Sequence, residues 1–271
     1  MGILNVTPDS FSDGGRSFDM GAAISHGLRL AANGADIIDV GGESTRPGSA
    51  PVPPEEEQRR VLPVIDALVR QHVVLSVDTR NAATMHAALD TGARIVNDVS
   101  GLAHDPDAAS VVAAHGCPAV LMHMRGTPAT MNSLAQYDDV VSEVRAELAA
   151  VLDRALETGI RRDRITLDPG IGFAKLPEHS IAVLRGLPSL VALGQPLLVG
   201  VSRKGFIGRL SGEPQADRRL GGSLAAGLFA LAGGASILRV HDVTETVQAI
   251  RVWQALTESG TVLLPHSGVR V

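Results

Sequence analysis

The feature that most constrains the fold is a regular alternation of two patterns along the chain. A short run of apolar and β-branched residues, typical of a buried strand, is followed each time by a longer stretch with helical spacing of apolar residues. This order predicts an α/β protein in which parallel strands are connected by crossover helices. Eight strand signals occur: Met1–Asn5, Ala35–Val40, Val73–Val77, Ile95–Val99, Ala119–Met122, Ile165–Leu167, the start of Leu197–Gly208, and Ile237–Val240.

The number of units selects between two arrangements of a parallel sheet. Eight βα units within about 250 residues fit a closed (β/α)8 TIM barrel. An open, doubly wound sheet is the alternative, but the G-x-G-x-x-G fingerprint expected after its first strand is absent. We therefore predict one barrel domain over residues 1–258, followed by a tail, 259–271, for which the sequence indicates no role.

Some of the predicted helices have recognisable features. Pro54 begins one helix, with Glu55–Glu57 in its first turn, where acidic side chains favour the positive end of the helix dipole. Pro63 falls inside that helix and should kink it. Asn81 is expected to cap the next helix. The segment Leu220–Ala235 is apolar nearly all round, so it should be either buried on all sides or part of an interface.

Polar side chains lie at the carboxyl end of every predicted strand. In a TIM barrel these ends meet on one face, where the active site is found. The residues concerned are Asn5, Glu43, Asp78, Asn97, His123, Asp168, Lys204 and His241. Asp78 and Asp168 could instead cap following helices, whereas a buried amide such as Asn97 needs partners that satisfy it. The pattern predicts a polar site at one end of the barrel.

Lysine is rare in this chain. Of 24 lysine and arginine residues, only Lys175 and Lys204 are lysines. Lys204 directly follows a predicted buried strand, and a compact ammonium group is not interchangeable with a planar guanidinium group. We therefore expect a functional role for Lys204, whereas Lys175, in a predicted loop, could be there by chance.

Composition and charge exclude several classes of protein. The formal net charge of −5 gives no basic surface for nucleic acid, so no nucleic-acid partner is expected. No apolar run approaches the ~20 residues needed to cross a bilayer, and polar residues interrupt any signal peptide, which predicts a soluble protein without a membrane partner. The single cysteine, Cys117, excludes an internal disulfide and suits a reducing cytoplasm.

Eight segments, one at each predicted strand end, together resemble the dihydropteroate synthase family. They are NVTPDSFSDGG (5–15), GGESTRPG (41–48), SVDT (76–79), VNDVSG (96–101), LMHMRGTP (121–128), DPGIGFAK (168–175), GVSRKGFIG (200–208) and RVHDV (239–243). They occur in the order that this family shows and cover Met1 to about Trp253. Ala174 departs from the pattern, because many members have glycine there, and its methyl group is expected to crowd the loop slightly.

The resemblance implies a TIM-barrel transferase with mobile loops after strands 1 and 2. The implied reaction joins p-aminobenzoate to 6-hydroxymethyl-7,8-dihydropterin diphosphate and yields 7,8-dihydropteroate and pyrophosphate in folate biosynthesis. The resemblance further implies Mg²⁺, a homodimer packed through helices of the second half of the barrel, and sulfonamides as mimics of p-aminobenzoate.

Two alternatives remain beside this interpretation. A pterin-dependent corrinoid methyltransferase could share the Asp and Asn residues of the site, but it would not need TPDSFSDGG, STRPG or a diphosphate-binding SRKG. A non-catalytic paralogue would bind pterin without turnover.

The resemblance also assigns residues to three parts of the site. Carboxylates and carboxamides can pair with the hydrogen-bonding edge of a pterin ring. The implied pterin-binding residues are Asp78, Asn97, Val99, Met122, Asp168, Phe173, Gly200 and Lys204. The implied diphosphate-binding residues are Asn5, Thr45, Arg46, Arg239 and His241, with Arg203 as a further candidate and with the Asn5 amide oxygen as a Mg²⁺ ligand. The implied p-aminobenzoate-binding residues are Phe11, Thr45, Pro47, Phe173, Ser202 and Lys204.

Asp78, Asp168 and Lys204 are the expected catalytic residues. The implied reaction is a substitution at the pterin methylene, where positive charge develops as pyrophosphate leaves. Ionised Asp78 and Asp168 would oppose that charge in a dry pocket. Because the arylamine is itself the nucleophile, no Ser-His-Asp or Cys-His arrangement is required, and Cys117 should lie at the opposite end of the barrel.

Overall fold

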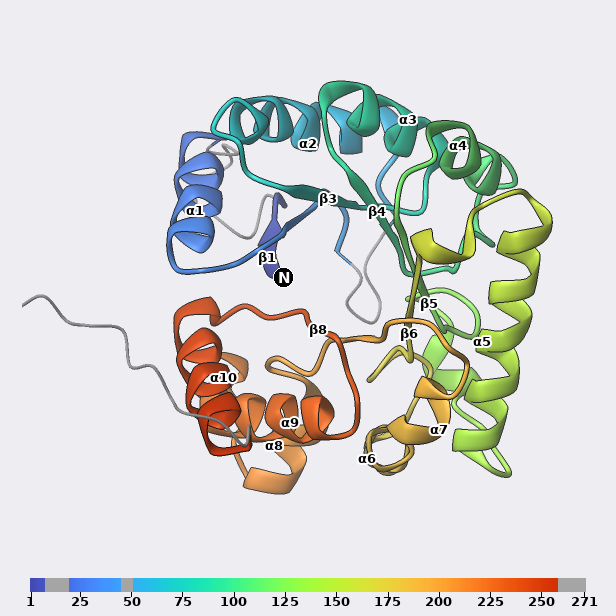
Figure 1. Ribbon diagram of the computed structural model, residues 1–271, viewed down its shortest axis with the longest axis vertical. Helices are drawn as coiled ribbons and strands as arrows, with labels where there is room; N and C mark the ends of the chain where they lie inside the picture. The colour runs from blue at the N-terminus through green and yellow to red at the C-terminus, as the bar shows by residue number, and fades with distance from the viewer. Residues whose placement is uncertain (8–19, 45–50, 258–271) are drawn as a thin grey trace, which may run out of the picture.

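The computed structural model describes residues 1–7, 20–44 and 51–257, which form a ring of parallel strands surrounded by helices (Figure 1). The strands are β1 (Gly2–Asn5), β2 (Ile38–Gly41), β3 (Leu75–Asp78), β4 (Ile95–Asp98), β5 (Ala119–Met122), β6 (Ile165–Asp168), β7 (Leu198–Val199) and β8 (Ile237–Leu238). The α-helices are α1 (Met20–Ala32), α2 (Pro54–Val69), α3 (Ala82–Thr91), α4 (Ala108–His115), α5 (Val140–Glu157), α6 (Pro177–Arg185), α7 (Leu187–Val191), α8 (Gly205–Ser211), α9 (Leu220–Ala232) and α10 (Val243–Thr257). Short 3₁₀ helices cover Met131–Leu134, Arg162–Arg164 and Ala216–Arg218.

Backbone hydrogen bonds close the strands into one ring. β1 to β6 form a sheet in sequence order, and β7 pairs with β8, all in parallel. Two single parallel bridges join these two sheets: Leu167 pairs with Leu197, and Gly2 pairs with Val240. At the second bridge the Ile3 amide donates to the Val240 carbonyl at 3.0 Å. The closed (β/α)8 barrel is therefore confirmed, and the open doubly wound sheet is excluded.

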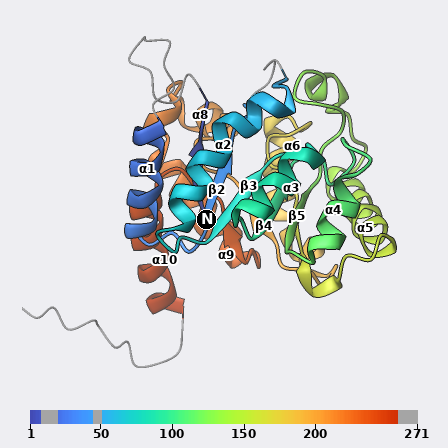
Figure 2. The same ribbon diagram turned by 90° about the horizontal axis from the view of Figure 1, so that it is seen from above.

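All eight predicted strands are present, although most are shorter than predicted. β5 has the predicted bounds, whereas β2 begins only at Ile38, and β7 and β8 contain two residues each. At these two short strands single bridges, rather than long ladders, continue the ring. Around the ring in Figure 1, α10 is the helix that comes next to α1, as expected when the last unit of a barrel meets the first, and both helices lie on the same side of the barrel in Figure 2. The turn after α1 meets α10, since a Cβ at Gly34 would lie 3.4 Å from Val247.

Aliphatic side chains fill the space between the strands and the surrounding helices. Strand residues that face inward are buried by the side chains that fill the barrel, and strand residues that face outward are buried by the helices. Because both faces are buried, the strands are apolar runs in the sequence. On the helical side, α5 buries one stripe that includes Val144, Leu148 and Leu152. Cys117 belongs to this core and precedes β5, at the amino ends of the strands, as predicted.

Hydrogen bonds of Glu57, in the first turn of α2, connect this helix to the residues that follow β3. α2 begins at Pro54 and continues through Pro63 to Val69. Asn81 occupies the N-cap position of α3, but the predicted capping bond is absent, because its Nδ2 donates instead to Glu57 Oε2 at 2.9 Å. Glu57 is fully buried and also accepts a bond from Thr79 Oγ1 at 2.8 Å. Asn81 is therefore the N-cap residue of α3, as predicted, but its side chain bonds a buried carboxylate of the neighbouring helix and makes no capping bond.

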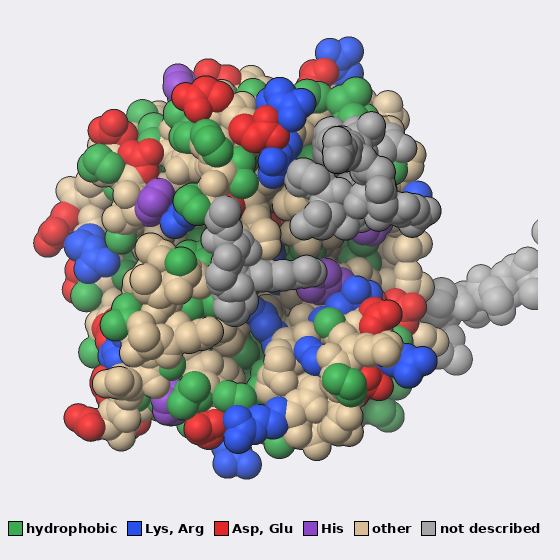
Figure 3. All heavy atoms as spheres, turned by 180° about the vertical axis from the view of Figure 1, so that it is seen from behind, with side chains coloured by type: hydrophobic (Ala, Val, Ile, Leu, Met, Phe, Trp, Pro, Cys, Tyr) green, Lys and Arg blue, Asp and Glu red, His purple; other side chains and the backbone are tan. Residues whose placement is uncertain are grey.

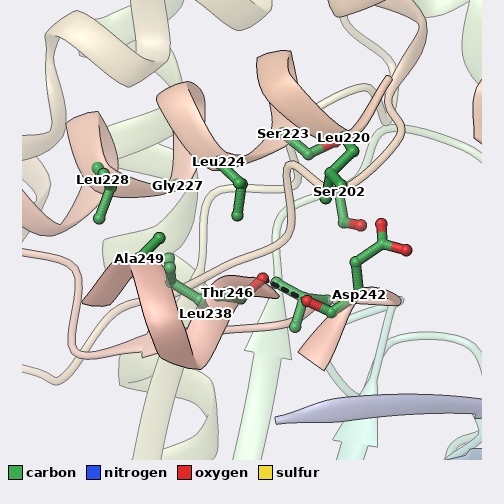
Figure 4. Close-up of a pocket in the computed structure, with 11 residues that line it drawn as sticks. Ser202, Leu220, Ser223, Leu224, Gly227, Leu228, Leu238, Asp242, Thr246 and Ala249 are labelled. Carbon is green, nitrogen blue, oxygen red and sulfur yellow. Dashed lines mark hydrogen bonds between the residues drawn. The ribbon is translucent and has the colours of Figure 1, made fainter. Parts of the chain in front are cut away.

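Helix α9 is not buried on all sides. Its residues Ser223, Gly227 and Ala230 are buried, whereas Phe229 is 50% exposed. α10 packs beside it, and the cleft between the two helices is mainly apolar, with leucine side chains along it and Ser202 and Asp242 at one end (Figure 4). Of the two predicted alternatives for this segment, complete burial is excluded.

Some predictions concern residues outside the described ranges. These are the mobility of the loops after β1 and β2, the tail, and the site residues Phe11, Thr45, Arg46 and Pro47. None of the helices in the described ranges is long and apolar enough to cross a membrane.

Candidate active site

The polar residues predicted from the strand ends meet at one end of the barrel. In the register of the sheet, Asn5 pairs with Gly41, Gly41 with Asp78, and Asp78 with Asn97, so these positions lie at one level of the barrel. Lys204 and His241 follow β7 and β8 and complete the ring on the other side. Figure 3 looks onto this end, where basic side chains and histidine lie near the centre.

A buried ion-pair network lies across the strand ends. Arg239 donates from Nε to Asp39 Oδ2 and from Nη2 to Asp78 Oδ2, each at 2.6 Å. Asn97 Nδ2 donates to the same Asp39 oxygen at 2.8 Å. Asp39 was not among the predicted site residues, although an acidic residue between Ile38 and Val40 in an apolar strand was a usable signal. The network holds Asp78 and Asn97 in fixed positions at the end of the barrel.

The two predicted catalytic carboxylates have little contact with water, since Asp168 is buried and the Asp78 side chain is 11% exposed, and neither is the N-cap residue of an α-helix. Burial raises the pKa of Asp78 to about 7, with Arg239 acting in the opposite direction. Burial also raises the pKa of Asp168, whose Oδ1 accepts a 2.7 Å bond from the Gly170 amide. Gly170 has φ +65°, and a Cβ there would lie 2.0 Å from the His123 carbonyl oxygen, so this turn requires glycine.

Lys204 and Phe173 come together although they belong to different βα units. Lys204 lies at the N-cap position of α8, and its Nζ is 4.3 Å from the centroid of the Phe173 ring. Burial lowers the pKa of Lys204 to about 8, with Asp168 acting in the opposite direction. The structure thus places an ammonium group against an aromatic face beside the two carboxylates.

The second lysine also has a defined place in the wall of the site. Lys175 is buried, with Nζ 2.8 Å from His123 Nδ1 and 3.1 Å from the Phe173 carbonyl oxygen. The other imidazole nitrogen, His123 Nε2, contacts Glu147 Oε2 at 2.9 Å. Burial lowers the pKa of Lys175 to about 7. Chance is therefore a poor explanation for a lysine at position 175. The scarcity of lysine in the sequence was the signal that singled out this residue.

Ser202 and His241 form a pair at the β7–β8 side of the site. Ser202 Oγ lies 3.0 Å from His241 Nδ1 and accepts a bond from the His241 amide at 3.2 Å. Burial, together with Arg203 and Arg239, lowers the pKa of His241 to about 4, so this imidazole is neutral near pH 7. Arg203 donates from Nε to Asp242 Oδ2 at 3.1 Å, so its charge is balanced within the protein.

The remaining described candidates lie around this cluster. Val99 and Met122 are buried beside the ends of β4 and β5. Gly200 faces Arg239, since a Cβ at Gly200 would lie 3.9 Å from the Arg239 Cβ. Asn5 ends β1, is half-buried, and its side-chain amide makes no hydrogen bond among the residues that the structure describes.

A buried ion pair anchors the chain on both sides of residues 45–50. Glu43 pairs with Arg80 at 3.0 Å, and each side chain is only 9% exposed. Glu43 Oε1 also accepts a 3.2 Å bond from the Val52 amide. One carboxylate therefore connects the residues before and after this segment to the loop that follows β3.

Comparison with known proteins gives consistent matches over nearly the whole chain. The family described as pterin binding enzyme matches residues 1–241. The dihydropteroate synthase of Synechocystis sp. is 47% identical over 257 residues, which cover 94% of this chain and 89% of that protein.

Solved structures are similar to the same extent. The dihydropteroate synthase of Xanthomonas albilineans with 4-aminobenzoic acid has a TM-score of 0.90 and 49% identity, covering 96% of this chain and 93% of that one. The complex of that species' enzyme with 7,8-dihydropteroate has a TM-score of 0.87 and 47% identity over the same shares.

Proposed function

This chain belongs to the pterin-binding enzymes and, among them, to the dihydropteroate synthases, and from that premise we propose how its residues carry out the reaction. The chain is a transferase that condenses p-aminobenzoate with 6-hydroxymethyl-7,8-dihydropterin diphosphate to give 7,8-dihydropteroate and pyrophosphate. The main support for these residue roles is that four predicted site residues lie together at one end of the closed barrel: Asp78, Asn97, Asp168 and Lys204.

The pterin ring is held by the buried polar residues at the strand ends. Asp168 and Asn97 offer the carboxylate and the carboxamide that match the amino group and ring nitrogens of a pterin. Val99 and Met122, both buried, supply apolar walls, and Gly200 leaves room beside Arg239. The network around Asp39 supports this role because it fixes the Asn97 amide before a ligand arrives.

Catalysis rests on stabilising positive charge at the pterin methylene. The arylamine nitrogen forms the new bond to the methylene carbon, the carbon–oxygen bond breaks, and its electron pair leaves with pyrophosphate. The nitrogen then loses one of its two protons to water or to the released pyrophosphate. The ionised forms of Asp78 and Asp168 lie in a site with little water, where a negative charge stabilises the developing cation more strongly than it would in water. Because the pKa of Asp78 is about 7, its ionised form increases as the pH rises through 7. Lys204 contributes a positive charge beside Phe173 and positions p-aminobenzoate.

The diphosphate is bound by Asn5, Arg239 and His241, with Thr45 and Arg46 from the loop after β2. His241 is neutral and contacts it as a hydrogen-bond donor, and Arg239 does so while remaining bonded to Asp39 and Asp78. Mg²⁺ fits this arrangement because the Asn5 amide oxygen is an available hard ligand, and Mg²⁺ is commonly held by one or two protein groups plus substrate phosphates. When bound, the ion would neutralise charge on the leaving pyrophosphate.

A pyrophosphate-release assay tests this function. With both substrates and Mg²⁺ the native chain should release pyrophosphate, and Asp168→Asn should remove most of this activity while the fold is retained. Omission of Mg²⁺ should lower the rate. No release with both substrates would support a non-catalytic pterin binder, and turnover only with a corrinoid methyl donor would support the methyltransferase.

The second substrate pocket is completed by the first ligand. The Lys204 ammonium lies 4.3 Å from the centroid of the Phe173 ring. Two stacked rings need at least about 4.5 Å between their centroids, so an arylamine ring fits between these two side chains only after they move apart. Phe11, Thr45 and Pro47 contribute from the loops after β1 and β2, and the Glu43–Arg80 pair anchors the second loop.

Calorimetric titration of p-aminobenzoate tests this order of binding. We expect weak binding to the free enzyme and a clear gain in the presence of a pterin and magnesium pyrophosphate, with the same dependence for a sulfonamide. Equal affinity in both titrations would mean that the pocket is already formed in the free enzyme.

A homodimer through α9 and α10 is the proposed assembly of this chain in the cytoplasm. Phe229, Val252 and Leu256 expose apolar surface on these two adjacent helices, with Leu256 80% exposed. A reduced, buried Cys117 is consistent with that compartment. Sedimentation at micromolar concentration should give a dimer, and Phe229→Glu should give a monomer. A native monomer would contradict the proposal.

A further inference from the structure

A group of two histidines and one aspartate lies on the outside of the barrel, away from the active site. His86 and Asp90 are four residues apart on α3, and His115 is the last residue of α4. α3 and α4 lie side by side in Figures 1 and 2 and pack against each other. Each helix leads into the amino end of the next strand, so this group lies toward the end of the barrel opposite the active site.

The ligand atoms of these three side chains converge. His86 Nδ1 and His115 Nε2 are 2.9 Å apart. Asp90 Oδ2 lies 3.7 Å from the first of these nitrogens, and Asp90 Oδ1 lies 4.0 Å from the second. Among the described residues, no second group of three such side chains brings its ligand atoms within 4.8 Å of one another.

We propose that His86, Asp90 and His115 form a binding site for a divalent transition-metal ion such as Zn²⁺. Zn²⁺ binds imidazole nitrogen and carboxylate oxygen at about 2.0–2.2 Å, so one ion bridges ligand atoms up to roughly 4.2 Å apart. The nitrogen–nitrogen separation of 2.9 Å and the nearest nitrogen–oxygen separations, 3.7 Å to Oδ2 and 4.0 Å to Oδ1, fall within that limit. Because each imidazole is nearest to a different oxygen, Asp90 would bind the ion through both oxygens or would turn to offer one. Two imidazoles with one carboxylate favour Zn²⁺, Co²⁺ or Ni²⁺ over Mg²⁺, which prefers oxygen ligands.

Electrostatics at this place favour a cation. His115 ends α4 directly before its C-cap residue Gly116, where the partial negative charge of a helix terminus lies. Asp90 adds a full negative charge and is not bonded to lysine or arginine among the described residues. The two imidazoles already contact each other edge to face, with ring centroids 5.1 Å apart.

The exposure of the group decides what an ion would do there. The side chains of His86 and Asp90 are each 61% exposed and that of His115 is 25% exposed, so an ion enters without opening the fold. Because the ligands come from two helices, the bound ion links α3 to α4 and stabilises the folded chain. Its remaining coordination positions face solvent and take water or a group from another molecule.

Titration calorimetry with Zn²⁺ in an excess of Mg²⁺, after removal of metals by a chelator, tests the site. The native chain should bind one Zn²⁺ with an affinity that falls at least about tenfold in His86→Gln, His115→Gln or Asp90→Asn, since even an outer partner of a metal ligand contributes about that much. The matched control is His104→Gln, which removes an exposed histidine outside the group. Co²⁺ should report the same site by its absorption bands.

Thermal unfolding supplies an independent measurement. Zn²⁺ should raise the unfolding temperature of the native chain and of His104→Gln, and not that of the double variant His86→Gln/His115→Gln. Circular dichroism and unchanged pyrophosphate release establish that the variants are folded. The proposal is overturned if the native chain binds no Zn²⁺, or if the double variant binds it as tightly as the native chain does.

Discussion

The ammonium group of Lys204 lies 4.3 Å from the centroid of the Phe173 ring, across two neighbouring βα units. A cation over an aromatic face is stabilised most where water is excluded, and Lys204 is buried enough for its pKa to fall to about 8. This contact joins the DPGIGFAK (168–175) and GVSRKGFIG (200–208) segments into one surface beside Asp168, although Phe173 and Lys204 are 31 positions apart in the sequence.

Lys204→Arg should lose most of the activity although the positive charge is kept. The larger planar guanidinium group would displace the reacting groups, and a misplacement of about 1 Å costs on the order of a hundredfold in rate. Steady-state pyrophosphate release measures the effect, and circular dichroism checks the fold. Turnover close to that of the native enzyme would remove the argument for lysine at this position.

Glu43→Gln should destabilise the protein and raise the KM for p-aminobenzoate. Removing the charge of one partner leaves Arg80 buried and unpaired, which typically costs about 3–5 kcal/mol. Urea unfolding and steady-state kinetics measure the two effects. The control is Asp163→Asn, which breaks the exposed Arg161–Asp163 pair and should change neither. Similar results for both variants would contradict an anchoring role.

Lys175 should make the free energy of unfolding depend on pH. Its pKa is about 7 in the folded chain against 10.5 ordinarily, so between these values the unfolded chain binds more protons. The stability of the native chain should therefore rise from pH 7 to pH 10, by at most about 1.4 kcal/mol per pH unit for one proton. Lys175→Met lacks this contribution, and urea unfolding of both proteins at several pH values isolates it. Parallel profiles would disprove it.

Ala174→Gly should leave the protein as stable as before or stabilise it by up to about 1.6 kcal/mol. Ala174 has φ +46°, a left-handed conformation that costs a residue with a Cβ about 1–2 kcal/mol. Glycine avoids this strain, but it makes the unfolded chain more flexible, which lowers the free energy of unfolding by about 0.4–1 kcal/mol. The strain that the structure shows at this position is therefore in the backbone conformation. The matched control, Ala150→Gly in the exposed face of α5, should cost about 1 kcal/mol. Equal losses in both variants would exclude strain at Ala174.

Much of the fold was determined by the sequence alone. Each strand and helix follows from the spacing of apolar residues over a few positions, which neighbours in the chain decide. The runs Ile95–Val99 and Ala119–Met122 could be placed to within a residue, and so could the start of α2 at Pro54. The polar residues after the strands indicated the site, because parallel strands bring their carboxyl ends to one face.

Only the tertiary structure decided which of these side chains are partners. Arg239 bonds Asp39 and Asp78, which are 200 and 161 residues away in the chain, and such pairs form only when the ring closes. Asn81 could act as a cap by its position in the sequence, but the buried Glu57 of α2 takes its amide instead. Lys175 gains a role only because β5 brings His123 beside it. The local spacing of apolar residues determines where strands and helices lie in the sequence. Polar groups that packing removes from water must have hydrogen-bond partners, and which partners are available depends on the whole barrel.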